Sequence, residues 1–434
     1  DSGPLAKIRN PSFDKSGKWL AFLATSTEKG KEDIWILNLE TRKMEVLFEN
    51  LDKPKSLRFS YDSSKLFFIA NAPRKKEDKK PDYDRITEMY QRWGDWRKRP
   101  HLFMIDLKTK ALSQITGGES NLFDYSLSKD GTKVALLRGV FTTLRPYLKS
   151  EIYLYDLENF TSKKILSWDR WPDISELELL KDNKTIAVMA SRGDMPEGGL
   201  KPKEHLAYNL NLFLVNVETG KYECVTDNFR PSLSSQAISV YSPRKNLFFN
   251  EKDNCLYFVA TDKDRVRLYK MNPSTKDFFL VDFDDPVLSS VSISFGGKKA
   301  LYYTSALGKF WEVKVGDLET FDIKTLWVPA EEVLSRVKLG LLEPFDVFAR
   351  DGEIIQGWLL YPPNYEKAKK YPTIVAYYGG VSPYGRAFRY EMFWLAGQGY
   401  IIYIVNPRGA VGYGQEFADA HCNDWGKEAG EDII

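Results

Sequence analysis

Two short apolar runs that end in glycines decide the fold: Pro372-Thr-Ile-Val-Ala-Tyr-Tyr-Gly-Gly-Val381 and Tyr400-Ile-Ile-Tyr-Ile-Val-Asn-Pro-Arg-Gly-Ala-Val-Gly-Tyr-Gly414. A short β-rich run bounded by turn formers predicts a buried strand. Residues 389–397, between the runs, carry the apolar side chains of a crossover helix. Fully apolar strands joined in this way predict a parallel sheet that is covered on both faces. Ligands of such sheets bind at the carboxyl ends of the strands, so we place the functional edge at the two glycine loops.

Three motifs around these strands make the chain resemble the prolyl oligopeptidase family of serine peptidases. They are Tyr378-Gly-Gly380, the run from Asn406 to Gly414, and Asp424-Trp-Gly426. The similarity covers roughly residues 327–434 by motif and the earlier residues by repeat pattern. The family, which includes dipeptidyl peptidases and acylaminoacyl peptidases, joins a β-propeller to an α/β-hydrolase domain. The resemblance therefore implies an N-terminal all-β propeller of about seven blades, followed by the first half of an α/β-hydrolase domain.

The residues before this region repeat a pattern of short strands. A hairpin such as Asp14–Phe22 is followed by an alternating strand that ends in an Asp/Asn-x-x-Thr-like turn, as in Ile34–Thr41. We count six copies at a spacing of roughly 40–60 residues, and the chain ends could complete a seventh. Several strands per copy at this spacing are typical of propeller blades.

These patterns predict three parts of the chain. Residues 1–326 form the propeller, residues 327–343 form a partly helical linker, and residues 344–434 form the N-terminal, incomplete part of the catalytic domain. In the last part, residues 345–349 and 354–361 flank a turn and predict an antiparallel hairpin.

The resemblance assigns an oxyanion hole to the loop after the strand at residues 373–377. By resemblance the Tyr378 phenol donates a hydrogen bond to the oxyanion, and Gly379 and Gly380 let the backbone approach the substrate. The alternative for Tyr378 is an aromatic side chain that packs at a strand end. For Arg408 in the second loop, we expect a structural ion pair with a carboxylate at the rim rather than a catalytic role.

A substrate-binding candidate lies in the charged insertion between residues 71 and 100. Family members that remove dipeptides hold the free α-amine of the substrate with acidic side chains from a propeller insertion, and Glu88 lies in a comparable place. The simpler alternative is a solvated helix face on which Glu88 faces Arg92.

The sequence lacks the nucleophile that a serine hydrolase needs. It contains no Gly-x-Ser-x-Gly elbow, and none of its histidines, which are His101, His205 and His421, suits a triad; we expect them to be packing or surface residues. We therefore expect the chain to be a fragment, or one piece of a nicked molecule, with the Ser-Asp-His triad beyond Ile434. About 200 further residues would complete such a domain, which otherwise keeps an unpaired, apolar sheet edge.

Composition excludes several other classes of protein. The 434 residues are 43% hydrophobic and 28% charged, with a net charge of +2, which offers no field for nucleic acid or acidic membranes. No apolar run is long enough to span a membrane, and three scattered cysteines predict no disulfide framework. We expect no metal or organic cofactor. The sequence does not fix the compartment, although it slightly favours a periplasmic or extracytoplasmic location over a cytoplasmic one.

Together these features predict a serine-type peptidase that hydrolyses peptide bonds in short peptides through an acyl-enzyme. Two alternatives remain: a non-enzymatic propeller binding module with a hydrolase remnant, and an acyl-peptide hydrolase or esterase. The expected partners are peptide substrates. A homodimer, and a second chain that carries the rest of the hydrolase domain, both stay open.

Overall fold

The computed structural model describes residues 7–25, 30–72, 99–118, 120–141, 148–168, 174–191, 209–233, 246–306, 309–377, 382–422, 424 and 426–434. The chain divides into two compact units. The first comprises Asp1–Asp169, Leu177–Ile186 and Val215–Lys221, and the second comprises Arg170–Glu176, Ala187–Leu214 and Tyr222–Ile434. The domain boundaries that we expect at residues 326 and 343 stay a prediction.

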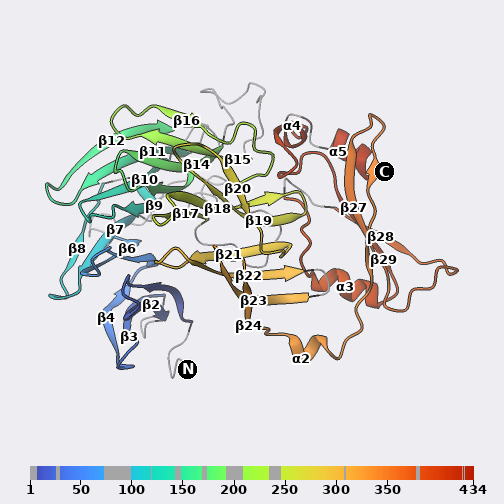
Figure 1. The fold of residues 1–434 in the computed structure, drawn as a ribbon, viewed down its shortest axis with the longest axis horizontal. Helices are drawn as coiled ribbons and strands as arrows, with labels where there is room; N and C mark the ends of the chain where they lie inside the picture. Colours follow the sequence, from blue (N-terminus) through green and yellow to red (C-terminus); the bar gives the residue numbers. More distant parts are fainter. Residues whose placement is uncertain are drawn as a thin grey trace, which may run out of the picture. The chain divides into compact units, whose positions relative to one another are not determined.

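The first unit contains three sheets of four strands (Figure 1). Their strands are β1 (Arg9–Phe13), β2 (Trp19–Thr25), β3 (Glu32–Asn38), β4 (Met44–Leu51), β5 (Lys55–Phe59), β6 (Lys65–Asn71), β7 (Pro100–Asp106), β8 (Leu112–Gln114), β9 (Asn121–Leu127), β10 (Lys133–Phe141), β11 (Leu148–Asp156) and β12 (Thr161–Trp168). Each sheet follows the order of the chain with antiparallel neighbours, for example β2 with β3 and β10 with β11.

Two more sheets follow, and the strands of the first of them fall in both units. That sheet has the order β13 (Ile174–Leu179), β14 (Thr185–Ser191), β15 (Leu210–Asn216) and β16 (Tyr222–Cys224). The other holds β17 (Leu247–Asn250), β18 (Cys255–Asp262), β19 (Arg265–Met271), β20 (Phe278–Val281), β21 (Val287–Ile293), β22 (Lys299–Ala306), β23 (Lys309–Asp317) and β24 (Ile323–Trp327). It consists of two four-strand groups joined by the single parallel pair Val266 and Val287.

The predicted repeat is therefore present as successive four-strand antiparallel groups, which is how propeller blades are built. The described residues contain about six such groups, and the expected count of about seven blades stays a prediction.

The Asp/Asn turns recur in these groups and hold the hairpins closed. In each turn the side-chain oxygen accepts hydrogen bonds from the backbone N–H groups two and three residues later, at 2.8–3.4 Å. These residues are Asn38, Asp106, Asp156, Asn216, Asn272 and Asp317. The backbone donors lower the pKa of Asp106, Asp156 and Asp317. The recurring sequence signal thus reflects a recurring local structure.

His101 lies in β7 and is a buried packing residue, as expected. Its Nδ1 lies 3.3 Å from the hydroxyl of Thr116, which also accepts the N–H of Leu102 at 2.9 Å. Burial, together with the nearby charge of Arg138, lowers the pKa of His101 to about 4.

This depressed pKa predicts that part of the stability is lost on mild acidification. Below about pH 6.5 the unfolded state binds a proton that the folded His101 does not bind until pH approaches 4. The free energy of unfolding is therefore highest above pH 6.5 and decreases as the pH is lowered. We expect a decrease of about 1 kcal/mol between pH 7 and pH 5, after solvent screening is allowed for. Urea unfolding of the wild type and of His101→Gln at pH 7 and pH 5 measures this decrease. Equal pH slopes for the two proteins would contradict the assignment.

The C-terminal part of the second unit is an α/β sheet of five strands. The strands are β25 (Leu342–Pro344), β26 (Val347–Phe348), β27 (Ile354–Leu360), β28 (Thr373–Ala376) and β29 (Ile401–Asn406), and the helices are α2 (Glu331–Leu334), α3 (Tyr390–Gly397), α4 (Gln415–Asp419) and α5 (Lys427–Ile433). The sheet order is β25-β27-β29-β28, with β26 paired to β27. β28 and β29 are parallel and α3 connects them, which confirms the predicted strand–helix–strand unit. β26 and β27 form the predicted antiparallel hairpin. The predicted linker helix is one short turn of helix, α2.

Helices cover both faces of this sheet at its central strands. Trp358, Leu360, Ile402 and Ile404 form one buried cluster with α3. The alternate positions Ile355, Tyr403 and Val405 form another, with Phe417 of α4 and Ile433 of α5. This alternation is the period of two that a strand imposes. Figure 1 shows α3 on one side of β28 and β29, and α4 and α5 near β27.

The expectation that the parallel sheet is covered on both faces is wrong at β28 in the described residues. Ile374 and Ala376 pack beneath α3, but Thr373 and Val375 are exposed, Val375 by 44%. In the described residues β28 pairs only with β29, and α4 and α5 pack over β27 and β29. The apolar composition of this strand therefore reflects a surface that the described residues leave open.

An exposed apolar strand of this kind predicts self-association of the 434-residue polypeptide when it is made by itself. We expect Val375→Lys to lower the aggregation rate about tenfold or more, because an edge charge blocks strand addition. The matched control is Val333→Lys on α2, where the same charge replaces a valine that is 65% exposed and belongs to a helix rather than to a strand. Light scattering at equal concentration measures the rate, and equal protection by both variants would point to net charge instead.

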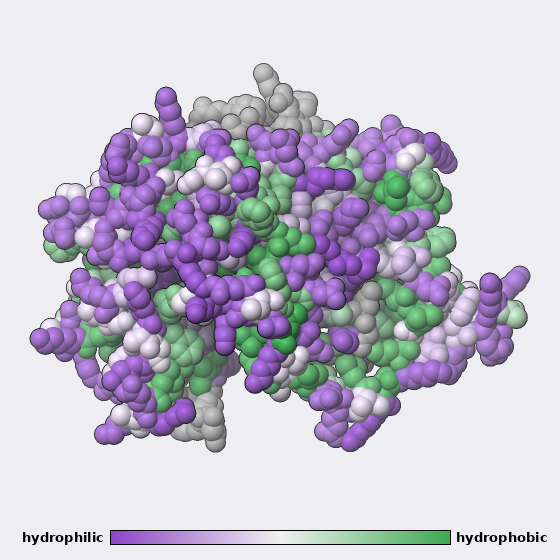
Figure 2. Space-filling model, in the orientation of Figure 1, coloured by the Kyte–Doolittle hydropathy of each residue, from purple (hydrophilic) through white to green (hydrophobic). Residues whose placement is uncertain are grey.

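The surface is otherwise mixed. On the face drawn in Figure 2, hydrophilic side chains predominate and hydrophobic ones gather in patches between them. Among the described residues, no helix has the length and apolarity required to cross a bilayer. The cysteines Cys224, Cys255 and Cys422 are all free thiols.

Candidate active-site edge of the sheet

The residues predicted for the oxyanion hole, Tyr378, Gly379 and Gly380, lie outside the described residues, and so does Glu88. The structure describes the residues on either side of the Tyr-Gly-Gly loop. β28 leads to Tyr377, and the chain is described again from Ser382. The geometry of the predicted functional edge therefore comes from residues 382–388 and from the loop after β29.

Asn406, the last residue of β29, joins these two loops. Its side chain is fully buried. The Oδ1 atom accepts the backbone N–H of Tyr384 at 2.7 Å, and Nδ2 donates to the backbone oxygen of Tyr384 at 3.0 Å and to the hydroxyl of Tyr413 at 2.9 Å. That hydroxyl donates in turn to Oε1 of Gln356 on β27 at 2.5 Å. One buried amide thus ties the chain at residue 384 to two strands of the sheet.

The Tyr384 side chain connects the two flanks of the Tyr-Gly-Gly loop. Its hydroxyl donates to the backbone oxygen of Tyr377 at 3.4 Å. The Arg389 guanidinium lies over its ring at 4.7 Å. Burial raises the pKa of Tyr384, an effect that the charge of Arg389 opposes. The phenol is therefore a neutral donor at ordinary pH.

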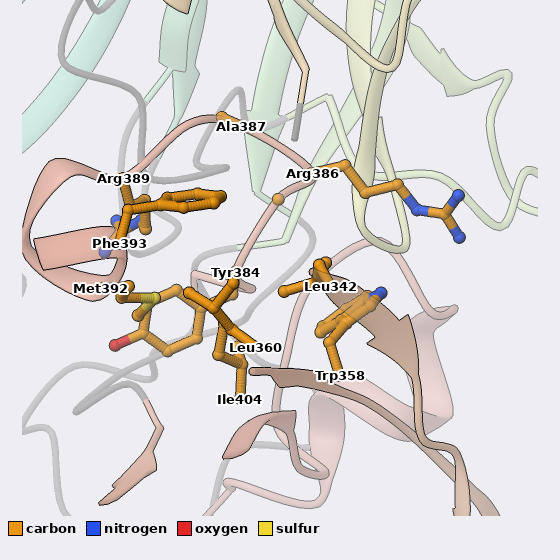
Figure 3. A pocket seen from close by; sticks show the side chains of 11 residues that line it. Leu342, Trp358, Leu360, Tyr384, Arg386, Ala387, Arg389, Met392, Phe393 and Ile404 are labelled. Carbon is orange, nitrogen blue, oxygen red and sulfur yellow. The ribbon is translucent and has the colours of Figure 1, made fainter. Parts of the chain in front are cut away.

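A cavity lined by Tyr384, Met392 and Ile404 is too small for a substrate. Figure 3 shows the Tyr384 ring beside Met392 and Ile404, while the Arg386 side chain points away from them. The volume of this cavity is about 20 Å³, which holds about one water molecule. We interpret it as an imperfection in packing and not as a binding pocket.

A single hairpin tip, between β18 and β19, contacts both loops. The Lys263 N–H donates to the oxygen of Gly412 at 2.9 Å. Gly412 has φ +91°, and a Cβ there would lie 2.9 Å from the oxygen of Thr261, so this approach requires glycine. On the other loop, Arg386 forms an ion pair with Asp264, and its N–H donates to the Asp264 oxygen at 2.8 Å. The hairpin thereby fixes both loops against one four-strand group.

Arg408 has the structural role that we expect from the sequence. Its Nη2 lies 2.7 Å from Oδ1 of Asp432, whose carboxylate is fully buried, and it also pairs with Asp351. The Arg408 N–H donates to the same Asp432 carboxylate at 2.8 Å. These carboxylates, with Asp432 first, raise the pKa of Arg408 above its usual value. The arginine thus fastens the second loop to α5.

His421 is likewise a buried packing residue. It lies so close to Gly409, which has φ +95°, that a Cβ on Gly409 would come within 2.1 Å of the imidazole ring. No group of three or more His, Cys, Asp or Glu side chains is arranged to hold a metal ion within the ranges that the structure describes.

Sequence reasoning missed the residues that organise this edge. In the sequence Asn406 is only the first residue of a motif; its burial, which requires hydrogen-bond partners, is visible in the structure alone. Tyr384, Gln356 and Asp264 carried no signal, because their partners lie far away along the chain.

Comparison with known proteins agrees with the fold and the motifs. Residues 386–434 match the profile described as "Prolyl oligopeptidase family". Over 98% of its length the chain is 24% identical to "Dipeptidyl-peptidase 5" of Porphyromonas gingivalis, and it covers 62% of that protein. It is 32% identical to "Probable dipeptidyl-peptidase 5" of Aspergillus terreus over 190 residues, which are 41% of this chain and 26% of that protein.

Among solved structures, the acylaminoacyl peptidase of Pyrococcus horikoshii superposes with a TM-score of 0.71 at 18% identity, and the match covers 98% of this chain and 62% of that one. This likeness concerns the fold. The chain thus spans about three fifths of the length of the Porphyromonas and Pyrococcus proteins. The motif resemblance, the profile match over residues 386–434 and the full-length similarity to a dipeptidyl peptidase all point to the prolyl oligopeptidase family.

Proposed function

We propose that this chain is part of a serine-type peptidase that hydrolyses peptide bonds in short peptides through an acyl-enzyme. The observation that carries the proposal is the loop after β28. The sequence places the family's Tyr-Gly-Gly motif at the carboxyl end of a parallel strand, and Asn406 fixes the chain on the far side of that motif. Donors held in fixed positions at this edge are what an oxyanion hole requires.

In this proposal Tyr378 donates its phenolic hydrogen to the oxyanion that develops when the scissile carbonyl is attacked. Gly379 and Gly380 leave room for the substrate backbone. We place the nucleophilic serine, with its Asp and His partners, outside residues 1–434, because these contain no Gly-x-Ser-x-Gly elbow. The serine would form the acyl-enzyme, and water would then release the acyl group.

The relatives support two classes of substrate. Some are named dipeptidyl peptidases, which favours release of dipeptides, and one structural relative is an acylaminoacyl peptidase, which favours release of an N-acylated amino acid. A dipeptidyl activity would need an acidic partner for the free amine, and Glu88 is our candidate. An acylaminoacyl activity would need no such partner.

The test is turnover of matched reporters by the natural protein that contains these residues. Dipeptidyl, N-acyl-amino-acid and simple ester reporters with the same leaving group are compared, alongside covalent labelling by a fluorophosphonate. Labelling with preferred turnover of either peptide-type reporter supports the proposal. Preference for the ester would favour an esterase, and no labelling or turnover would leave a binding module as the better interpretation.

A further inference from the structure

We infer that Asn406 is a positioning residue of the peptidase, which sets the loop after β28 for catalysis without touching the substrate. This inference rests on the proposed function. It concerns an amide that the motif comparison leaves without a role, and it follows from the contacts of Asn406 with Tyr384, Tyr413 and Gln356.

The side-chain amide of Asn406 makes the two hydrogen bonds that the backbone of a neighbouring strand would make. It accepts the N–H and donates to the C=O of one residue, Tyr384, at 2.7 and 3.0 Å. Two hydrogen bonds to the same backbone residue fix both the position and the orientation of the peptide groups there. The chain at residue 384 is thus bound to the sheet as if it were a further strand.

The orientation of the amide is itself fixed. The second hydrogen of Nδ2 goes to the hydroxyl of Tyr413 at 2.9 Å, and this hydroxyl donates to Gln356 at 2.5 Å. A flipped amide would direct its oxygen at the Tyr384 carbonyl and at a hydroxyl whose hydrogen is already used. Both polar groups of Asn406 are therefore satisfied in one orientation only, and at full burial the loss of any of these bonds is costly.

This clamp reaches the residue that precedes the proposed oxyanion donor. Tyr384, held by Asn406, donates its hydroxyl to the backbone oxygen of Tyr377. Tyr377 and Tyr384 flank the Tyr-Gly-Gly segment on its two sides; Tyr384 is bound directly to the buried amide, and Tyr377 is connected to it through the Tyr384 hydroxyl. A displacement of about 1 Å at a catalytic group costs up to about a hundredfold in rate. Asn406 is thus expected to affect the chemical step more than substrate binding.

The test is steady-state kinetics of the natural protein with the best reporter. We expect Asn406→Ala to lower kcat by about 10-fold to 100-fold with KM changed less than about twofold. Asn406→Asp keeps the acceptor for the Tyr384 N–H but loses both donor hydrogens. We expect this variant to have a lowered kcat as well. Tyr413→Phe, which leaves Asn406 in place, should give a smaller loss and serves if the Asn406 variants fold poorly.

The matched control is Asn250→Ala. Asn250 is also a buried asparagine with backbone bonds on both sides, to the oxygen of Gly297 at 3.1 Å and from the N–H of Lys252 at 3.1 Å, but it lies in the blade strand β17. A loss of Tm like that of Asn406→Ala, with kcat retained, would separate positioning from stability.

A double-mutant cycle shows the route of the effect. If Asn406 acts through the oxyanion donor, Asn406→Ala should cost little in a Tyr378→Phe background. The inference would be overturned if Asn406→Ala left kcat unchanged, or if it lowered kcat by the full factor in the Tyr378→Phe background as well. Neither result would contradict the proposed peptidase function. An inactive and unlabelled wild type would overturn the proposed function itself, and the inference with it.

Discussion

Replacing Arg408 with methionine is expected to lower the free energy of unfolding by about 3–5 kcal/mol. The reason is the Asp432 carboxylate, which is fully buried and depends on Arg408 for its charge partner. Without the guanidinium that carboxylate keeps only the backbone N–H of residue 408 from this pair. Desolvation of an unpaired carboxylate then opposes folding. Urea unfolding at pH 7, followed by fluorescence, measures the change.

The control for this prediction removes both charges. In Arg408→Met with Asp432→Asn no charge is buried without a partner, and most of the lost stability should return. If the double variant is as unstable as the single one, packing of the arginine side chain is the cause instead. We expect kcat of the folded single variant to stay within about threefold of wild type, since its effect on the site is only indirect.

The features that sequence reasoning predicts well here are local ones. The hairpin at residues 345–361 and the strand–helix–strand unit at residues 372–406 follow from apolar runs and turn residues within a short stretch of chain. The Asp/Asn turns follow from the same logic, since each side chain bonds to backbone that is two or three residues away. In each of these features the interacting residues lie close together in the sequence, so the sequence alone predicts the structure.

The features that it misses depend on distant parts of the chain. The ion pair of Arg386 with Asp264 joins residues that are 122 positions apart. Asn406 and Tyr384 are nearer, but whether an asparagine binds a passing loop depends on where the loop folds back. The exposure of Val375 likewise depends on which helices cover which strands. The sequence could predict that Arg408 would find a carboxylate, but it could not select Asp432.

The second large effect concerns the oxyanion donor. We expect Tyr378→Phe in the natural protein to reduce kcat by about 100-fold to 1,000-fold with little change in KM. The phenol would strengthen its hydrogen bond only as charge develops on the scissile oxygen, so its loss affects the transition state more than the bound substrate. The change removes one oxygen atom, and we expect the folded structure to keep its stability within about 1 kcal/mol.

The control is Tyr390→Phe at the start of α3, where the tyrosine is 69% exposed. Acyl-enzyme formation and turnover of one reporter are compared by stopped-flow kinetics, because an oxyanion donor serves both tetrahedral intermediates. Equal slowing of both steps supports the assignment. If Tyr378→Phe slows neither step, or raises KM alone, the tyrosine is a packing or binding residue. The donors of the oxyanion hole would then be backbone N–H groups, and the positioning of Tyr378 by Asn406 would fail as an explanation of catalysis.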